Sequence, residues 1–580
     1  MKNLDQYKKN RKLLKYTGIV IFFIFLSFLY TYLAWRTGWI YVGHDRPFHL
    51  ERLEEAYQNV RHGHFFVSVI NTYSFGKIGQ AINAYYPWGN LLPYVIIRNF
   101  LVNPVNSYYA YLTLEQFLGL IIAFYCSMKI LNSFSKGLLF AIILRFSTIV
   151  MFNDYTRVDI GESWAFVFVP IAFYGLYSLL VCRKYKKGVL KLSIGLSLEL
   201  YCHVMVSFLT AIIFFILLIV WLVSYKPNKR ILTKVFKSLV LSIFIFVLNT
   251  LVVTMPIVSF GSGITLKLPD KEFFATRQIS FGDSVTAALN NNILSVINIG
   301  VIGIVLLIFC IANYHKFTKL SKSLFLIGFI LMLFSTKLFP WCLLRTTIVS
   351  SIQFGWRLMP FAFLLLIFSF INEVDSSVFE SILISSVVII LTLGSVINFI
   401  NGQNNYSNNV EKPFDAYSYN LNYKTYKQSL SNNHVVRNSF YLDYLPITSL
   451  KRSGFTYNHI ANINGRRKTL EEKNIVPIYQ GEKYIFDNKN AVYRAELPFV
   501  IYNPKDYLLK VNNKFQKLKI NKNRLLSVSS KEPIQSVEIR YKTPKNFIYA
   551  RYISLVSLII SILLILYPGK VTHEKNKNLG

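Results

Sequence analysis

The chain has 580 residues, of which 53% are hydrophobic, and its mean hydropathy is +0.39. Several apolar runs can cross a hydrocarbon layer about 30 Å thick, which takes roughly 20 helical residues, and this excludes a soluble globular protein. The formal net charge of +35 would suit a nucleic-acid partner. However, much of the basic excess lies in short loops beside apolar runs, as in cytoplasmic loops of membrane proteins. We therefore expect no nucleic-acid partner.

The apolar runs predict an α-helical polytopic membrane protein with about twelve transmembrane helices. Placing the basic clusters at 1–15, 183–187, 226–237, 316–322 and the tail from residue 570 inside makes both termini cytoplasmic. The protein is then a multi-pass protein of the cell membrane. The first run lacks a small-residue cleavage site, so we treat it as a true helix. The expected spans are residues 16–34, 109–130, 137–152, 164–182, 189–201, 204–223, 238–256, 294–312, 323–338, 354–370, 380–400 and 553–566.

The first outer loop opens with many ionisable side chains between Gly43 and Arg52. Asp45 and His49 are four residues apart, so a helix starting here would place them on one face. An outward carboxylate can act as a general base, or can hold a divalent cation together with an imidazole. The guanidinium of Arg46 or of Arg52 could pair with phosphate. The alternative is an amphipathic helix whose charges meet only headgroups and solvent.

The second outer segment, residues 153–162, places Arg157, Asp159 and Glu162 in front of a span with almost no other charge. Asp159 and Glu162 are three residues apart and would share a helical face. Glu162 also fits an acidic first turn that complements the helix dipole. Capping and catalysis both stay open for Glu162, whereas Arg157 favours a functional role.

His203 lies between two apolar segments that we expect to form a hairpin turning outward. A satisfied core histidine is the simpler interpretation, and a ligand contact is the alternative. The stretch Tyr85-Tyr86-Pro87-Trp88 in the first loop also allows two interpretations. Tyr86 and Trp88 fit either an aromatic belt at the membrane interface or a wall of a sugar or lipid groove.

The run Gln353-Phe354-Gly355-Trp356-Arg357 opens a span on the outer side. An arginine at that depth is costly unless it meets an anion or a carboxylate. For Arg357 we expect either an ion pair with Glu162 or Asp159, or a contact with a lipid phosphate. Gln353 stands next to it as a second candidate for substrate contacts.

The composition becomes polar and rich in Asn, Lys and Tyr between about residues 401 and 547. Alternating apolar and polar residues predict strands, and Asn512-Asn513 predicts a hairpin turn. Residues 401–409 read as a linker. None of the five cysteines falls in this segment, so it folds without disulfides. We therefore expect a transmembrane domain with outer loops (1–400), an extracytoplasmic β-rich domain (401–547), and a final helix with a basic cytoplasmic tail (548–580).

The sequence contains no Walker A loop, no Rossmann glycine pattern, no HExxH motif and no GxSxG motif. An enzyme built on this chain would draw on no ATP of its own. Its energy would come from an activated substrate, such as a phosphate-linked sugar.

Taken together, these segments resemble the GT-C superfamily of polytopic glycosyltransferases, and specifically the bacterial YfhO-like membrane proteins. The resembling stretches are scattered over most of the chain. They are Gly43-His44-Asp45-Arg46-Pro47-Phe48-His49-Leu50-Glu51-Arg52, Tyr85-Tyr86-Pro87-Trp88, Arg157-Val158-Asp159-Ile160-Gly161-Glu162, Gln353-Phe354-Gly355-Trp356-Arg357, Asp443-Tyr444-Leu445-Pro446 and Glu496-Leu497-Pro498-Phe499.

The resemblance implies a GT-C-like fold and an inverting sugar transfer on the outer face. The donor would be a polyprenyl-phosphate-linked sugar, and the acceptor an envelope polysaccharide, teichoic acid or glycolipid. Asp45 is implied to be the base, and Arg157 and Arg357 would hold the lipid phosphate. No metal ligand is assigned, although a divalent cation, Mg²⁺ or Mn²⁺, is compatible with the chemistry; membrane lipids are expected partners. The candidate site residues are therefore Asp45, His49 and Glu162 for catalysis, and Arg52, Arg157, Asp159, His203, Gln353, Arg357, Tyr86 and Trp88 for substrate binding.

Two other function classes compete with this hypothesis. A transporter or flippase of a lipid-linked saccharide would line a continuous path between the two membrane faces with charged residues. A non-catalytic scaffold would bind envelope polymers through its basic outer domain.

Overall fold

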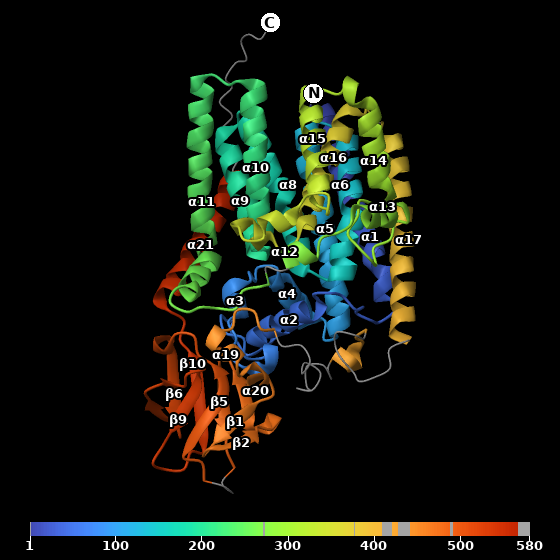
Figure 1. The fold of residues 1–580 in the computed structure, drawn as a ribbon. Helices are drawn as coiled ribbons and strands as arrows, with labels where there is room; N and C mark the ends of the chain where they lie inside the picture. Colours follow the sequence, from blue (N-terminus) through green and yellow to red (C-terminus); the bar gives the residue numbers. More distant parts are fainter. Residues whose placement is uncertain are drawn as a thin grey trace.

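We describe the fold from a computed structural model, over residues 2–270, 273–375, 377–408, 420–426, 441–487 and 491–566. A helical bundle and a β-rich domain lie end to end, with a layer of short helices between them (Figure 1). Helix α1 begins, and helix α21 ends, on the side of the bundle away from the β-rich domain. The chain is thus a polytopic helical membrane protein with a C-terminal β-rich domain. The basic tail from residue 570 lies outside the described residues.

The bundle contains a helix at each expected span. Over the described ranges, nine helical segments are long and apolar enough to cross a membrane. Helices α9, α14 and α15 also occupy expected spans but are shorter or more charged than those nine. The bundle helices are α1 (Lys2–Trp35), α5 (Pro104–Leu131), α6 (Phe134–Arg145), α7 (Thr148–Met151), α8 (Ile160–Leu180), α9 (Tyr185–Cys202), α10 (Val204–Tyr225), α11 (Lys229–Gly261), α14 (Gly300–Asn313), α15 (Lys319–Phe334), α16 (Met359–Glu373), α17 (Val378–Asn408) and α21 (Lys545–Leu566).

The layer between the bundle and the β-rich domain comes mainly from the first outer loop. It includes α2 (Arg46–Arg61), α3 (Ile82–Tyr85) and α4 (Leu91–Phe100). Two further short helices, α12 (Phe273–Thr276) and α13 (Phe281–Leu289), follow α11.

Buried carboxylates on α2 order the rest of this loop. The Glu55 carboxylate accepts hydrogen bonds from the backbone N–H groups of Thr72, Tyr73 and Ser74 at 2.8–3.3 Å. Glu51 accepts from the backbone N–H of Phe75 in the same way. Because a buried carboxylate is costly unless its lone pairs are used, these contacts fix the loop against α2.

The β-rich domain consists of two five-stranded antiparallel sheets with strand orders β2-β1-β5-β9-β8 and β3-β4-β10-β6-β7. Asn512 and Asn513, with φ of 49° and 63°, form the predicted turn between β6 and β7. Two short helices, α19 (Ile447–Leu450) and α20 (Ser453–Tyr457), precede the sheets. The strands are β1 (Ile460–Ile463), β2 (Arg466–Thr469), β3 (Ile475–Ile478), β4 (Gly481–Ile485), β5 (Arg494–Val500), β6 (Tyr507–Val511), β7 (Lys514–Gln516), β8 (Lys519–Ile520), β9 (Leu525–Ser529) and β10 (Ser536–Tyr541).

The core of the β-rich domain is shared with the first outer loop. Val69, Ile70 and Ile78 belong to the same apolar cluster as the strand residues. The backbone N–H of Val500 donates to the carbonyl of Ile78 at 2.8 Å. The β-rich domain is therefore docked on the layer beneath the bundle. Helix α17 also continues to Asn408, so the segment 401–408 is helical where a linker was expected.

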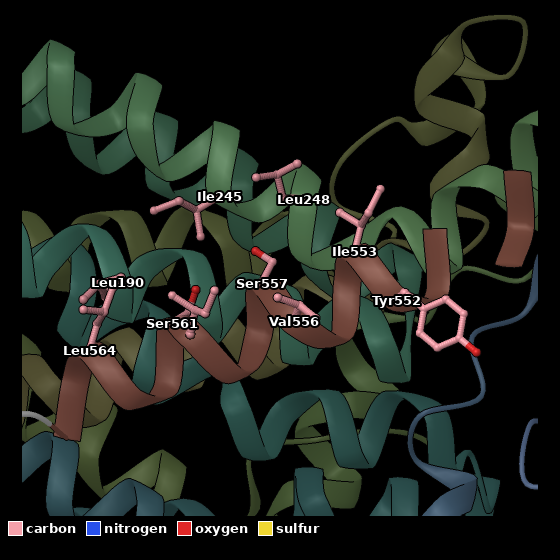
Figure 2. A pocket seen from close by; sticks show the side chains of 10 residues that line it. Leu190, Ile245, Leu248, Tyr552, Ile553, Val556, Ser557, Ser561 and Leu564 are labelled. Carbon is pink, nitrogen blue, oxygen red and sulfur yellow. The ribbon is translucent and has the colours of Figure 1, made fainter. Parts of the chain in front are cut away.

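Helix α21 returns from the β-rich domain into the bundle beside α11 (Figure 1). Ser554 on α21 donates to the carbonyl of Leu248, and Ser557 donates to the Asn249 side chain at 2.7 Å. An apolar cavity of about 540 Å³ lies here. Its lining side chains come from α9, α11 and α21 (Figure 2). Its lining contains no charged side chain, so this cavity suits hydrocarbon chains and carries no chemistry of its own.

Glycines set the distance between α8 and α9. A Cβ on Gly195 would come within 2.4 Å of the Ala172 backbone nitrogen, whereas a Cβ on Gly394 of α17 would meet nothing within 4 Å. We expect Gly195→Leu to force the two helices apart at a cost of about 1–3 kcal/mol or more. Heating the detergent-solubilised protein and measuring the surviving monodisperse fraction checks this. Gly394→Leu should match wild type, and equal losses for both variants would contradict the account.

Candidate functional site

A cavity of about 1090 Å³ lies where the bundle meets the outer layer. Side chains from distant segments line it, including the start of α2, the end of α3, the segment before α8, the junction of α9 and α10, and the segment before α16. A cavity of this size can hold a sugar with its phosphate.

Arg157 is the centre of the charged wall of this cavity. Its Nη2 lies 3.1 Å from an Asp45 carboxylate oxygen and 2.8 Å from one of Asp159. Its Nη1 lies 2.6 Å from Glu162 and 3.1 Å from the Asn153 amide oxygen. Charge-assisted bonds of this kind are about twice as strong as neutral ones, so one guanidinium holds three carboxylates together.

Arg357 extends the network from the other side. Its Nε lies 2.7 Å from the second carboxylate oxygen of Glu162, and its Nη1 donates to the Gln353 side chain at 2.9 Å. Arg357 therefore forms the expected ion pair with Glu162. Glu162 thus bridges two guanidiniums and lies behind the cavity wall, whereas Gln353 and Arg357 line it.

Asp159 fixes the start of α8. Its Oδ1 accepts the backbone N–H groups of Gly161 and Glu162, both at 3.1 Å, and lies 3.2 Å from His49 Nε2. Asp159 is therefore the N-cap of α8, and Glu162 is the acidic residue of its first turn, as the dipole argument predicted. Burial acts to raise the pKa of Asp159, but the Arg157 charge and the His49 hydrogen bond outweigh it and hold that pKa well below its usual range.

The local backbone brings these groups together. Residues 152–157 form one turn of π-helix, a feature often found at functional sites. Val158 follows with a positive φ of 58°. The backbone N–H of Asp45 donates to the Arg157 carbonyl at 2.8 Å. Gly43 permits this approach, because a Cβ there would lie 2.3 Å from the Val158 side chain.

Asp45 is the accessible acid of the network. Its side chain is 40% exposed, against 4% for Asp159 and 5% for Glu162. Asp45 stands at the N-terminus of α2, but its side chain caps no helical N–H. Its carboxylate therefore faces the cavity with a single guanidinium contact.

Aromatic rings line the cavity beside the charged wall, where the Tyr86 hydroxyl donates to Asp159 at 3.4 Å. The Phe48 ring contacts Tyr86 and Tyr441 with centroids 5.3 Å apart in each pair, and all three line the cavity. Aromatic faces beside carboxylates suit a sugar, which presents apolar C–H faces and hydroxyl edges.

Two substrate-binding candidates lie outside the cavity lining. Arg52 is buried, its Nη2 donates to the Pro87 carbonyl at 2.5 Å, and its guanidinium stacks over the Tyr86 ring at 4.2 Å. It therefore supports Tyr86 from behind. Trp88 borders a separate small cavity near α11 and α21.

The remaining candidates lie together on the cavity wall: Asp45, His49, Tyr86, Arg157, Asp159, His203, Gln353 and Arg357. Sequence reasoning did not select Arg277, Tyr441, Asp443 or Tyr444, which also line it. Asp443 and Tyr444 could have been selected, because they lie in one of the stretches that resemble the YfhO-like proteins. Arg277 carried no such signal.

The site also offers a ligand set for a cation. Ligand atoms of Asp159, Glu162 and His203 lie within 4.8 Å of one another, and carboxylates with one imidazole suit Mn²⁺ or Mg²⁺. The carboxylates of Asp45, Asp159 and Glu162 outnumber the guanidiniums of Arg157 and Arg357 by one. The residues present therefore fit a divalent cation, which would replace part of the guanidinium contacts.

Comparisons with known proteins add one structural likeness. The chain is similar to the arabinofuranosyltransferase AftD from Mycobacteria, with 14% sequence identity and a TM-score of 0.41 over 67% of this chain and 27% of that one. The chain thus spans about a quarter of that protein's length, and a likeness at this level assigns no activity. No protein-family model and no curated protein sequence matches the chain.

Removing the Arg157 guanidinium should destabilise the protein. Arg157→Met would leave the buried carboxylates of Asp159 and Glu162 facing each other, and breaking a buried ion pair from one side costs about 3–5 kcal/mol. Thermal unfolding in detergent measures the effect, with the exposed Arg345→Met as the matched control. An unchanged melting temperature for Arg157→Met would show that the network contributes nothing to the fold.

His203 predicts a pH dependence. Burial lowers the pKa of His203 to about 4, although the Glu162 and Asp159 carboxylates act to raise it. Its folded pKa lies below the ordinary value of about 6.5, so its contribution to stability is present above pH 6.5 and is lost as pH falls toward 4. We expect the melting temperature of wild type to fall more between pH 7 and 4.5 than that of His203→Gln. Parallel curves would contradict a neutral buried imidazole.

Proposed function

We propose that this protein is a membrane glycosyltransferase of the GT-C type that transfers a sugar from a polyprenyl-phosphate donor to a cell-envelope acceptor on the outer face. The observation that carries the proposal is the accessible Asp45 carboxylate, held by Arg157 at the wall of a sugar-sized cavity between the bundle and the outer domain.

The charge distribution supports this orientation. The connections at 181–184, 226–228 and 314–318 lie at the end of the bundle where α1 begins, and each is next to lysine and arginine clusters. Short basic loops are retained in the cytoplasm. Both termini are then cytoplasmic, and the cavity and the β-rich domain are extracytoplasmic.

The donor would enter from the membrane side. Val204, Met205 and Ile257, at the ends of α10 and α11, form an apolar part of the cavity lining. An isoprenoid chain can lie along such helix ends while its phosphate and sugar reach the charged wall. Arg357 and Arg277 line the same cavity.

The proposed reaction is a single displacement. Asp45 accepts the proton of an acceptor hydroxyl, and the hydroxyl oxygen forms a bond to the anomeric carbon. The bond from that carbon to the phosphate oxygen breaks, and its electron pair leaves with the lipid phosphate. Arginine side chains at the wall stabilise the charge that develops on the phosphate. A divalent ion held by Asp159, Glu162 and His203 would supply further positive charge for the same purpose.

The position of the charges favours an enzyme over a transporter. Asp45, Arg157, Asp159 and Arg357 all lie at helix ends on one side of the bundle. A transporter would instead need a charged path that runs between the two faces.

Replacing the base tests the proposal. We expect Asp45→Asn to reduce sugar transfer by about 10²–10⁴-fold, because the amide cannot accept the acceptor proton. The protein in nanodiscs would be supplied with a set of radiolabelled polyprenyl-phosphate sugars and with envelope fragments from cells that lack the gene. Asp283→Asn, an exposed acid on α13, is the matched control. Sugar transfer by Asp45→Asn at the wild-type rate would contradict the proposed function. So would the absence of sugar transfer by the wild-type protein.

A further inference from the structure

The turn that leads into the β-rich domain forms part of the cavity wall. Tyr441, Asp443 and Tyr444 line the same cavity as Asp45, although they follow Asp45 by almost 400 residues. The outer domain therefore contributes side chains directly to the candidate active site.

This turn is anchored at several points. Gln80 Nε2 donates to the carbonyls of Tyr441 and Asp443, both at 2.7 Å. The Tyr502 hydroxyl donates to the Tyr444 carbonyl at 2.9 Å, and the Tyr444 N–H donates to the Lys267 carbonyl at 2.6 Å. Contacts from the first loop, from the segment after α11 and from the β-rich domain thus hold the turn 441–444 in place.

The anchoring holds a strained backbone. Tyr444 has a φ of 65°, a conformation that a bulky residue rarely adopts. Its ring stacks on Tyr85 at a centroid distance of 4.8 Å with an interplanar angle of 5°. Strain of this kind persists where the surroundings over-determine it, and it clusters at ligand-binding sites. Here it fixes where the Asp443 side chain is placed.

The Asp443 carboxylate is available to a ligand. Within the described part of the chain, no residue donates a hydrogen bond to it, whereas Asp159 and Glu162 each accept hydrogen bonds from two or more neighbours. Burial raises the pKa of Asp443, and the Lys267 charge opposes that shift. A half-buried carboxylate with unused acceptor positions suits hydroxyl groups, and the Tyr441 ring beside it suits the face of a sugar.

The two walls differ in what they can bind. The apolar helix ends at Val204 and Ile257 face the bundle, from which a lipid-linked donor must come. The wall at 441–444 faces the outer domain, from which an envelope acceptor must come. An ionised carboxylate offers only acceptors and repels a phosphate, so the Asp443 side chain favours a neutral, hydroxyl-rich acceptor over a phosphate polymer.

We propose that Asp443 positions the acceptor, a neutral glycan, by accepting hydrogen bonds from its hydroxyl groups, and that the β-rich domain thereby takes part in acceptor recognition. This inference rests on the proposed glycosyl transfer. Of the acceptors considered for that transfer, a polysaccharide, a teichoic acid or a glycolipid, it selects the neutral glycan.

The test separates acceptor binding from donor turnover. The full-length protein in nanodiscs is given the polyprenyl-phosphate sugar that supports Asp45-dependent transfer. Neutral glycan fragments from envelopes of cells that lack the gene are titrated as acceptor, and synthetic polyglycerol phosphate is titrated in parallel. We expect Asp443→Asn to raise the KM for the glycan by about tenfold or more. The kcat and the donor hydrolysis without acceptor should stay within about twofold, and Asp443→Glu should restore part of the affinity. Glu532→Gln, an exposed acid of the same domain, is the matched control.

Three outcomes would overturn this inference. An unchanged KM for Asp443→Asn would remove the contact, and equal losses of transfer and donor hydrolysis would show a role in folding or catalysis instead. Saturation by polyglycerol phosphate but not by the neutral glycan would assign a teichoic-acid-like acceptor. If Asp45-dependent turnover persists in any of these cases, the proposed transferase function still stands.

Discussion

The structure depends on one guanidinium at the outer end of the bundle. Arg157 contacts carboxylates from the α2 start, the α8 cap and the first turn of α8, and Glu162 passes the connection on to Arg357 at the start of α16. Without Arg157, three acids would face one another at the membrane surface, where unpaired charge is costly. Arg157 contacts one carboxylate oxygen of Asp45, and the Asp45 side chain lines the cavity. Stability and the proposed chemistry therefore depend on the same residues.

The outer parts of the protein form one continuous body around the cavity. The first outer loop supplies Val69, Ile70 and Ile78 to the core of the β-rich domain. The turn before that domain in turn supplies Asp443 to the cavity. The cavity thus has one wall made by helix ends and one made by the outer domain. Under the proposed function, the donor and the acceptor would each approach along one of these walls.

Local sequence patterns predicted those features that depend on neighbouring residues. Long apolar runs gave the bundle helices, and the Asn512-Asn513 pair gave the β6–β7 turn. The cost of a lone arginine at a helix start left two partners open for Arg357, a carboxylate or a lipid phosphate, and the structure shows the ion pair with Glu162. Long-range packing was not predictable in this way. Arg52 supports Tyr86 and Trp88 borders another cavity, because the fold of the first outer loop depends on buried carboxylates and on the β-rich domain, which neighbouring residues do not reveal.

The proposed function requires that the cavity wall containing Asp45 face the outside of the cell. Cysteine labelling with a membrane-impermeant maleimide in intact cells measures this directly. In a Cys342→Ser background, which removes the exposed native cysteine, His44→Cys next to the base should be labelled without permeabilisation. Lys226→Cys, between α10 and α11, should be labelled only after it. Labelling of Lys226→Cys alone in intact cells would place the cavity in the cytoplasm and contradict the account.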